Sequence, residues 1–488
     1  MAEADGCENQ SDQEGSNSRS STPNSTSTYE YSHEPYETFQ DKVLALARTI
    51  SDCNDVSLQR LRGGSYNRVV IANLRKEKDS VRGIFRIPRF TDVTGPIENA
   101  EGTENERLPV EMEVLDQAAV LQLLASRGVP APGLLAFDAS ARNAIQAPYT
   151  FQQCSGGSLL DKIYGTMSLD EKLGIVRALV HVLAKAETIE FLRSGILVAE
   201  QALDTATIAS HLSGREGKSL PVKIKPFAND DSTALTGLIS GKLYEHLEQE
   251  REFGSDSPIM KMWERMRDIH DEMQARGLFR SLNKSATSLS HSVLYHWDLE
   301  PRNILVKRTE NGAKWTIDMV IDWDRVQAVP AVLARKPPIW LWDFSSDNDH
   351  ASIASDYDGD VDILSATRYD RASGKLSPED QQIRNAFEEH FVAKLAEMYD
   401  GYDMEAYQNE AYGAGRWIRR LARFAIHGAS DSQDLKRFEH LDEEWTAHCL
   451  ALDAEETKKK KKTLKPRQRT LMALLALTVL TAGALYLY

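Results

Sequence analysis

Within residues 37–155, several short runs of apolar and polar side chains are typical of β-strands. Two such runs make up residues 58–72 and are joined by a glycine turn, and a third run covers residues 81–89. From Pro109 to Arg127 the apolar positions recur at helical spacing instead. This pattern predicts a small β-rich region with one helix behind its third strand.

Helical spacing dominates between residues 156 and 455. A long amphipathic helix is predicted from Leu169 to Phe191, with Ser168 or Asp170 as its cap. Further helices are predicted over residues 233–253, 256–275, 378–399, 403–425 and 432–454. We therefore expect an α+β chain whose second part is larger and mainly helical.

One predicted β-hairpin lies within this helical part. Its first strand begins at Ile304, and its turn is the segment Glu310-Asn311-Gly312. Asp298 and Asn303 precede the first strand, and Asp322 follows the second. The two strands should bring Asn303 and Asp322 to the same end of the hairpin.

These polar residues suit the transfer of a phosphoryl group from ATP. The reaction needs a base that orients the attacking hydroxyl and oxygen ligands that hold Mg²⁺ on the phosphates. Asp298 would supply the base, and Asn303 and Asp322 would hold the metal, which prefers oxygen and takes few carboxylates. Each residue alone is weak evidence, and the alternative is an ordinary hairpin with polar ends.

The segment Tyr295-His296-Trp297-Asp298-Leu299-Glu300-Pro301-Arg302-Asn303 resembles the aminoglycoside phosphotransferase family, small-molecule kinases that share the bilobal fold of protein kinases. The resemblance extends from about Leu58 to Phe424 and is greatest with fungal members. The family more often has His-Gly-Asp-x-His-Pro-x-Asn, whereas this chain has Trp297 for the Gly and Glu300 for the second His. Neither departure removes a catalytic atom.

The resemblance implies a protein-kinase-like fold, with a nucleotide-binding N-lobe over residues 37–155. The C-lobe over residues 156–455 would carry the catalytic loop and the acceptor site. ATP and Mg²⁺ are the implied cofactors, and the hydroxyl of a small molecule is the implied acceptor. Trp323-Asp324 stands where protein kinases have Phe-Gly, and no activation loop is evident, which argues against a protein substrate. Asp324 is either a further metal ligand or a turn residue.

The resemblance also indicates the nucleotide contacts. Backbone amides of the turn Gly63-Gly64-Ser65 would approach the phosphates, since glycine leaves room for them. Arg86 stands where the family has the cation that contacts the α- and β-phosphates; alternatively, it points to solvent beside Arg82. Backbone groups near Gln153 and Cys154 would bond the adenine edge.

The largest departure from the family concerns the helix behind Arg86. The family has a Glu there that pairs with the phosphate-binding cation, and this chain has Gln117, with Glu113 one turn earlier. Gln117 could hydrogen-bond Arg86 without neutralising it, whereas Glu113 could do both if the register shifts by a turn. The departure favours a rival hypothesis, a pseudokinase or nucleotide-binding scaffold tethered to a membrane. An atypical protein kinase is a third reading.

The late segment Pro337–Phe344 contains Trp340 and Trp342, which could stack on a substrate, although core packing is the favoured interpretation. The four cysteines, Cys7, Cys53, Cys154 and Cys449, are too widely spaced to indicate disulfides or a zinc site. This spacing fits a reducing cytosolic setting, as does the absence of a secretory leader at the start of the sequence. Residues 1–36 are polar and are predicted to be disordered.

The net charge of −15 includes eight positive charges from the basic linker 456–469, so the rest of the chain is strongly acidic. This balance argues against nucleic-acid binding. An acidic body could attract a cationic substrate such as an amino sugar, but an ordinary soluble surface explains it as well. No feature of the sequence indicates a protein partner.

Residues 470–488 carry no charge, and as a helix they would be about 28 Å long, close to the thickness of a bilayer core. We expect a single-pass tail anchor in an intracellular membrane, either the endoplasmic reticulum or the mitochondrial outer membrane. The basic linker would keep the catalytic lobes on the cytosolic side. The alternatives are packing of this segment against another protein and an error in the gene end.

Overall fold

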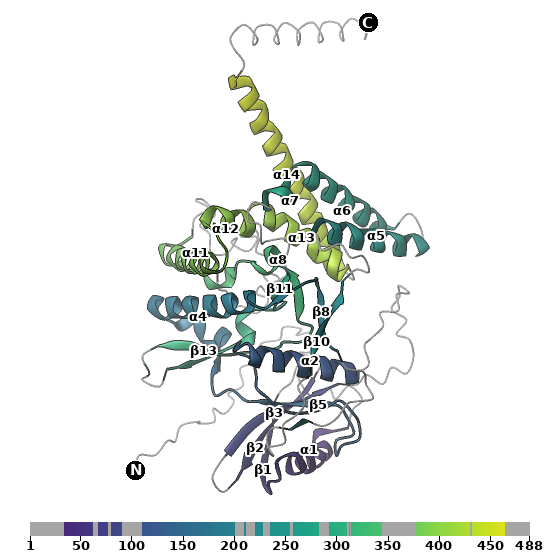
Figure 1. Cartoon of the computed structure of the whole chain (residues 1–488), viewed down its shortest axis with the longest axis vertical. Coiled ribbons are helices and arrows are strands. Elements are labelled where there is room, and N and C mark those ends of the chain that lie inside the picture. Colours follow the sequence, from purple (N-terminus) through teal and green to yellow (C-terminus); the bar gives the residue numbers. More distant parts are fainter. Residues whose placement is uncertain are drawn as a thin grey trace, which may run out of the picture.

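The computed structural model describes residues 34–61, 67–76, 80–89, 110–200, 209–210, 220–227, 235–253, 257–282, 292–309, 312, 314–343, 376–429 and 432–463. These residues form two lobes, a β-rich one at the N-terminal end and a larger, mainly helical one (Figure 1). Most of the predicted disordered tail and the whole of the predicted membrane span lie outside the described residues. The bilobal α+β fold is confirmed.

The N-lobe is built on a six-stranded sheet with the order β1-β2-β3-β5-β4-β9. Its strands are β1 (Asp55–Arg60), β2 (Asn67–Arg75), β3 (Ser80–Pro88), β4 (Leu134–Asp138), β5 (Tyr149–Gln153) and β9 (Ala209–Ser210). β1 and β2 pair antiparallel across the predicted glycine turn, as do β2 and β3. Two helices pack on the sheet, α1 (Tyr36–Ser51) and α2 (Val110–Ser126).

The alternation of β3 decides where Arg86 points. Phe85 and Ile87 are buried with Val43 of α1 in one apolar core. Because successive side chains of a strand face opposite sides, Arg86 must face away from that core. Its side chain is consequently directed to the cleft between the lobes, where it meets residues of the C-lobe.

The C-lobe contains two sheets, most strands of which the sequence pattern does not predict. A five-stranded sheet has the order β10-β8-β14-β11-β7, and a three-stranded sheet has the order β13-β12-β6. The strands are β6 (Ser158–Leu159), β7 (Glu190–Phe191), β8 (Gly195–Ala199), β10 (Val222–Pro226), β11 (Ser292–Tyr295), β12 (Ile304–Arg308), β13 (Trp315–Val320) and β14 (Gln327–Pro330). Only the β12–β13 hairpin was predicted; the other strands are too short to show a clear period.

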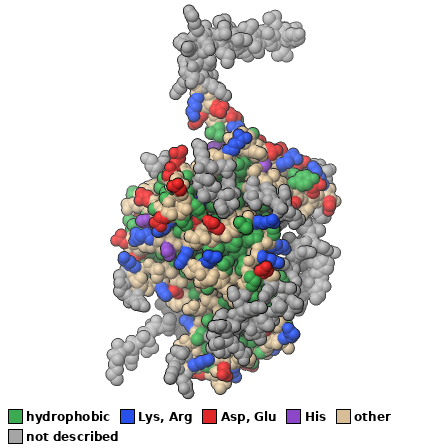
Figure 2. All heavy atoms as spheres, in the orientation of Figure 1, with side chains coloured by type: hydrophobic (Ala, Val, Ile, Leu, Met, Phe, Trp, Pro, Cys, Tyr) green, Lys and Arg blue, Asp and Glu red, His purple; other side chains and the backbone are tan. Residues whose placement is uncertain are grey.

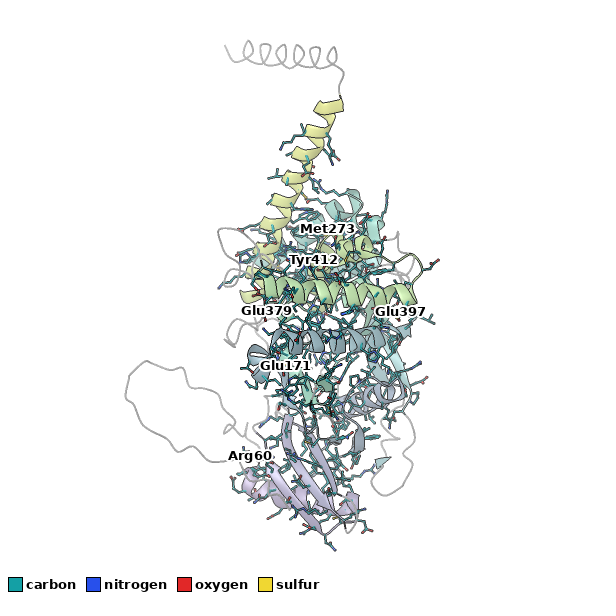
Figure 3. The ribbon with its side chains drawn as sticks, turned by 90° about the vertical axis from the view of Figure 1, so that its left-hand side faces the viewer. Arg60, Glu171, Met273, Glu379, Glu397 and Tyr412 are labelled. Carbon is teal, nitrogen blue, oxygen red and sulfur yellow. The ribbon has the colours of Figure 1, made fainter. Side chains whose placement is uncertain are left out.

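The helices mostly follow the predicted ranges. They are α3 (Leu160–Ile163), α4 (Leu169–Glu187), α5 (Leu235–Phe253), α6 (Pro258–Ala275), α7 (Leu278–Leu282), α8 (Ala331–Ala334), α11 (Pro378–Met398), α12 (Met404–Ala411), α13 (Ala414–His427) and α14 (Ser432–Thr463). Ser168 caps α4 in a capping box with Glu171. Figure 3 shows α11, between the labelled Glu379 and Glu397, running above α4, and Lys172 joins the two helices through a 2.9 Å ion pair with Glu379.

Two of the predicted helix boundaries are wrong. The predicted helix over 403–425 is two helices, because Gly413 has a non-helical backbone and lies against Asn409, where a Cβ would come within 2.7 Å of that amide. The predicted helix ending at Phe191 stops at Glu187, and the following residues form β7 instead.

A buried ion cluster fixes the segment that follows α8. Arg335 is 1% exposed, and its guanidinium binds Glu187 at 2.5 Å and Glu410 at 2.8 Å. The hydroxyls of Tyr399 and Tyr402 donate to the same two carboxylates. Since removal of one member would leave an uncompensated buried charge, this cluster holds the residues after α8 in one position.

The surface and the C-terminal helix bear on the predicted membrane attachment. On the face in Figure 2, acidic and basic side chains are intermixed over the described residues. Helix α14 leads away from the body, with residues 451–459 exposed (Figure 1). No helix within the described ranges is long and apolar enough to cross a bilayer.

Candidate active site

Asp298 lies on the loop between β11 and β12, and both of its carboxylate oxygens accept hydrogen bonds. Arg302 Nη2 donates to Oδ1 at 2.5 Å, and Asn303 Nδ2 donates to Oδ2 at 2.8 Å. The 3₁₀ turn η3 (Pro301–Asn303) reverses the chain, so that Asn303 Nδ2 also reaches the backbone oxygen of Asp298 at 2.8 Å. Asn303 Nδ2 makes both of these hydrogen bonds, so the amide oxygen Oδ1 is left to bind a metal. Oxygen is the ligand that Mg²⁺ prefers.

His296 connects the two halves of the site. Its Nδ1 accepts the backbone N–H of Asp298 at 3.2 Å, and its Nε2 lies 3.0 Å from the backbone oxygen of Ile321. These contacts assign the proton to Nε2 of a neutral imidazole, since Nδ1 must accept. Burial lowers the pKa of His296, which favours the same neutral form. The imidazole thereby sets the position of Asp298 relative to Asp322, the residue that follows Ile321.

The hairpin brings Asn303 and Asp322 to one end, as predicted. Ile304 pairs with Val320, and the N–H of Ile321 donates to the backbone oxygen of Asn303 at 2.8 Å. Asp322 has a φ of 67°, in the left-handed region that a non-glycine residue seldom adopts. Such a conformation is typical of functional sites, where the surrounding structure maintains it.

Arg86 reaches from the N-lobe to two carboxylates of the C-lobe. Its Nη2 lies 3.2 Å from Asp322 Oδ1 and 2.7 Å from Asp324 Oδ2. The alternative in which Arg86 points to solvent is therefore wrong. Partial burial raises the pKa of Asp322, and the charge of Asp324 raises it further, while Arg86 lowers it.

Gln117 binds Asp324 rather than Arg86. Its Nε2 donates to Asp324 Oδ1, while its Oε1 accepts from Thr150 Oγ1 at 2.8 Å and from Gln152 Nε2 at 3.2 Å. A carboxylate at this position could accept both bonds from β5 but could not donate to Asp324. An amide therefore fits this position better than the Glu of the family.

Glu113 lies exposed one turn before Gln117, so the shifted register is not adopted. Its charge acts on Asp116, which accepts the N–H of Ala199 at 2.7 Å. Burial chiefly raises the pKa of Asp116 to about 6, and Glu113 adds to the shift. Asp116 thus joins α2 to the five-stranded sheet.

In the predicted hinge, the backbone of Gln153 and Cys154 still makes sheet-like hydrogen bonds to neighbouring segments. The N–H of Gln153 donates to Gly133 at 2.7 Å, and the N–H of Cys154 donates to Arg82 at 3.1 Å. An adenine contact at these two residues would have to use their carbonyl oxygens. Burial raises the pKa of the Cys154 thiol. The turn Gly63-Gly64-Ser65 lies outside the described residues.

The hinge is anchored to the catalytic hairpin. Ser155 Oγ donates to Asp318 Oδ2 at 2.6 Å and accepts the N–H of Gly157 at 2.8 Å. Lys307 pairs with the other oxygen of Asp318 at 2.5 Å. The link between the lobes is therefore attached to the β12–β13 hairpin, which the candidate metal ligands Asn303 and Asp322 flank.

The two tryptophans after α8 act as structural residues. Trp342 is fully buried and lies against Phe387, as core packing predicts. Trp340 packs edge-on against Tyr164, and its indole N–H donates to the backbone oxygen of Leu299 at 3.2 Å. Trp340 thus supports the loop that carries Asp298.

A cavity of about 330 Å³ opens beside Asp298. Its walls come from β11, the catalytic loop, β14, the α8 region and α13. Asp298 and Arg302 face it from the catalytic loop, and Gln327 faces it from β14. Since an acceptor hydroxyl must reach Asp298, this cavity is the candidate acceptor site.

The residues present fit a divalent cation and a nucleotide. Asn303, Asp322 and Asp324 provide one amide and two carboxylates, the oxygen donors that Mg²⁺ takes in kinase sites. Asp322 and Asp324 lie 3.2 and 2.7 Å from the same Arg86 Nη2, so a bound cation would neutralise two neighbouring carboxylates. Arg86 lies against the same carboxylates, where it can reach phosphates on the metal.

This arrangement defines a protein-kinase-like phosphotransferase. The model of the phosphotransferase enzyme family matches residues 57–332, more than half of the chain. The chain therefore belongs to this family, and it is a phosphotransferase. No curated protein sequence matches the chain.

Solved structures of small-molecule kinases are similar to the chain. Choline kinase from Cryptosporidium parvum is 12% identical, with a TM-score of 0.42, and the match covers 86% of this chain and 97% of that one. A putative aminoglycoside phosphotransferase from Ralstonia eutropha is 14% identical, with a TM-score of 0.40, over 84% and 98% of the two chains. A glucosamine kinase is 15% identical, with a TM-score of 0.35, over 88% of each chain.

The positions of three residues in the site were not predicted from the sequence. Arg302 binds the candidate base, Asp324 accepts from Arg86 and Gln117, and Gln327 faces the acceptor cavity. Arg302 could have been suspected, because it immediately precedes Asn303 within the motif. Gln327 gave no signal, since it stands among apolar residues of an unpredicted strand.

Proposed function

We propose that this protein transfers the γ-phosphoryl group of ATP to a hydroxyl of a small molecule, with Mg²⁺ as cofactor. The observation that carries the proposal is the convergence of Asp298, Asn303, Asp322 and Arg86 at one end of the β12–β13 hairpin. In phosphoryl transfer, such groups act mainly by positioning and by electrostatic stabilisation.

The proposed reaction uses these residues as follows. The acceptor hydroxyl, oriented by a hydrogen bond to Asp298, attacks the γ-phosphorus, and its proton passes to the Asp298 carboxylate. The bond from that phosphorus to the bridging oxygen breaks, and ADP leaves with the bonding electrons. Arg86 binds the phosphates, and Mg²⁺ held by Asn303 and Asp322 would neutralise their charge.

Two observations support a small molecule rather than a protein as the acceptor. The cavity beside Asp298 has a volume of about 330 Å³, within the usual range for small-ligand sites. Within the described segment 314–343, the chain passes from Asp324 into β14 at Gln327, without the activation loop of protein kinases.

Nucleotide binding separates this proposal from a scaffold that binds no nucleotide, and the loss of phosphate transfer would separate it from a nucleotide-binding scaffold. ATP with Mg²⁺ is expected to raise the unfolding temperature of the full-length protein. Arg86→Met should remove most of this shift, whereas Arg82→Met, an exposed change on the same strand, should leave it intact. Absence of any shift in the wild-type protein would support the scaffold.

We also propose that residues 470–488 anchor the protein in an intracellular membrane, with the lobes facing the cytosol. The uncharged sequence after a basic linker supports this, as does the direction of α14 away from the body (Figure 1). A chain ending before Lys458 should move from the membrane fraction to the soluble fraction. Soluble full-length protein in cells would disprove the anchor.

A further inference from the structure

We infer that the phosphate acceptor is an uncharged alcohol with an apolar body, and that Trp297 is the residue that binds this body. The reacting hydroxyl would lie at Asp298, and the remainder of the molecule would lie against the indole ring. This inference rests on the proposed function, because it concerns the acceptor of the same reaction.

Trp297 immediately precedes Asp298 on the catalytic loop, at the position where the family more often has Gly. Its side chain is 43% exposed. Single exposed apolar side chains are common on protein surfaces, but Trp297 lies in the wall of the cavity beside Asp298. The other large apolar side chains exposed among the described residues line neither this cavity nor its neighbour; they are Leu192, Tyr244, Leu450 and Leu452.

Two neighbouring rings hold the indole of Trp297 in place. The ring centre of His427, the last residue of α13, is 3.7 Å from that of the indole, and Tyr295 of β11 meets the indole edge to face at 6.1 Å. Burial chiefly lowers the pKa of His427 to about 4, and the charges of Arg423 and Arg325 add to the shift. The imidazole is therefore neutral near pH 7, and the three rings form an uncharged aromatic surface beside the candidate base.

Further apolar side chains extend this aromatic surface. In the cavity beside Asp298, the aliphatic residues that share the wall with Trp297 are Val329, Leu333, Ala422 and Ile426. Trp297 also lines a second cavity, of about 90 Å³, whose wall is mainly apolar. The apolar residues of that wall include Leu183 of α4, Ile339 after α8 and Phe391 of α11. An acceptor whose hydroxyl reaches Asp298 would therefore meet apolar side chains, and burial of its own apolar surface against them is favourable.

The charged groups of the cavity already have partners within the protein. Both oxygens of Asp298 accept hydrogen bonds, and Arg302 donates one of them. Arg419 donates to three backbone oxygens, and Arg423 lies 3.5 Å from a carboxylate oxygen of α14. Lys336 also interacts with another part of the chain. A charged ligand would lose its hydration here without a free counter-charge, so the cavity favours an uncharged one.

A cationic alcohol is the main competitor for this site, because an ammonium group can contact the face of an indole. The overall acidic charge of the chain also suggests such an acceptor. However, four of the residues that line the cavity are basic and only Asp298 is acidic, so the wall does not favour a further positive charge. Amino sugars and choline-like alcohols should therefore bind less tightly than an uncharged alcohol of the same size.

The test compares alcohols that are built on the same six-membered carbon ring. The full-length protein is first saturated with Mg²⁺ and a non-hydrolysable ATP analogue. It is then titrated at constant ionic strength with cyclohexanol, inositol, 4-aminocyclohexanol and 4-hydroxycyclohexanecarboxylate, and binding is followed by ligand-observed NMR, which detects weak ligands. Cyclohexanol should bind more tightly than each of the other three compounds, by about fivefold or more.

Substitutions of Trp297 test its role in the same titration. Trp297→Ala should weaken the binding of cyclohexanol by about fivefold or more, because it removes the apolar surface beside Asp298. Trp297→Phe keeps an aromatic ring and should stay within about threefold of the wild type. Tyr244→Ala removes another exposed aromatic ring, on α5 and outside the cavity, and should leave the affinity unchanged. Binding of the nucleotide analogue in the first step shows that each variant is folded.

Tighter binding of inositol or of either charged alcohol than of cyclohexanol would overturn the inference. So would the absence of cyclohexanol binding, or equal affinities in the wild type and Trp297→Ala. Failure of the proposed function itself would be seen separately, as absence of Mg²⁺-dependent nucleotide binding by the wild type in the first step.

Discussion

Arg86 of the N-lobe and Asp324 of the C-lobe form an ion pair of 2.7 Å across the cleft. The other oxygen of Asp324 accepts from Gln117 of α2. The carboxylate that pairs with Arg86, the candidate phosphate-binding cation, therefore comes from the segment after β13 rather than from helix α2. Gln117 is thus no sign of an inactive site, because it orients the carboxylate that binds Arg86.

Gln117→Glu distinguishes this arrangement from the usual one of the family. If the helix needed a Glu, the change would improve ATP binding. Here it should raise the KM for ATP, by about tenfold, because it places a second carboxylate beside Asp324 and removes the donor to it. Asp324→Asn in the same chain should restore part of the affinity, since an amide can donate to the new Glu. Higher affinity in the single variant would contradict the assignment.

Asp322 makes metal binding depend on pH. Its pKa lies above the ordinary value of 3.8, chiefly through partial burial and then through Asp324. Mg²⁺ requires the ionised carboxylate, so the affinity for Mg²⁺ with ATP should fall as the pH is lowered toward that raised pKa. Asp324→Asn removes the like charge and should move this fall to lower pH. Titration of both proteins with Mg²⁺ at a series of pH values measures the shift.

The same linkage affects the stability of the unliganded protein. Because the pKa of Asp322 is higher in the folded state, folding retains a proton, and the protein should lose stability as the pH rises through the window above 3.8. The loss should be smaller in Asp324→Asn. Urea unfolding without nucleotide or metal, over the same pH series, tests the sign.

His296 should matter for both stability and turnover. His296→Phe keeps an aromatic ring against Trp323 but leaves the N–H of Asp298 and the oxygen of Ile321 without their partner. The expected cost is about 1–3 kcal/mol of stability, with a fall in kcat because Asp298 loses its fixed position. His181→Phe, an exposed change on α4, serves as the control. Unchanged kcat in His296→Phe would disprove the positioning role.

The pH dependence of His296 has the opposite sign to that of Asp322. Burial lowers its pKa below the ordinary value of 6.5, so the unfolded state binds the proton more readily. The contribution of the neutral His296 to the free energy of unfolding is complete above pH 6.5 and is lost as the pH falls below 6.5. In His296→Phe this part of the acid sensitivity should disappear from the unfolding curves.

The sequence predicted those parts of the site that depend on local spacing. Asn303 and Asp322 stand at the ends of two strands joined by a short turn, so pairing alone brings them together. Arg86 lies in an alternating strand whose buried side follows from Phe85 and Ile87. In each case the positions of the side chains follow from the alternation along a strand or from the pairing of a hairpin.

The contacts between the two lobes could not be predicted from local sequence patterns. Gln117 and Asp324 are separated by 207 residues, and their meeting depends on how α2 packs against the five-stranded sheet through Asp116. That sheet was missed, because β8 and β14 are short and buried on both faces, so they show no alternation. Gln327 lies on one of these strands, so the composition of the acceptor cavity depended on the tertiary structure.

The most direct test of the account is transfer of labelled phosphate from ATP by the wild type and by Asp298→Ala. The account predicts Mg²⁺-dependent phosphorylation of a small molecule from a metabolite extract by the wild type. Asp298→Ala should lose this activity by a factor of about a hundred or more while it still binds Mg²⁺ and nucleotide. Equal transfer by the two proteins would contradict the central claim.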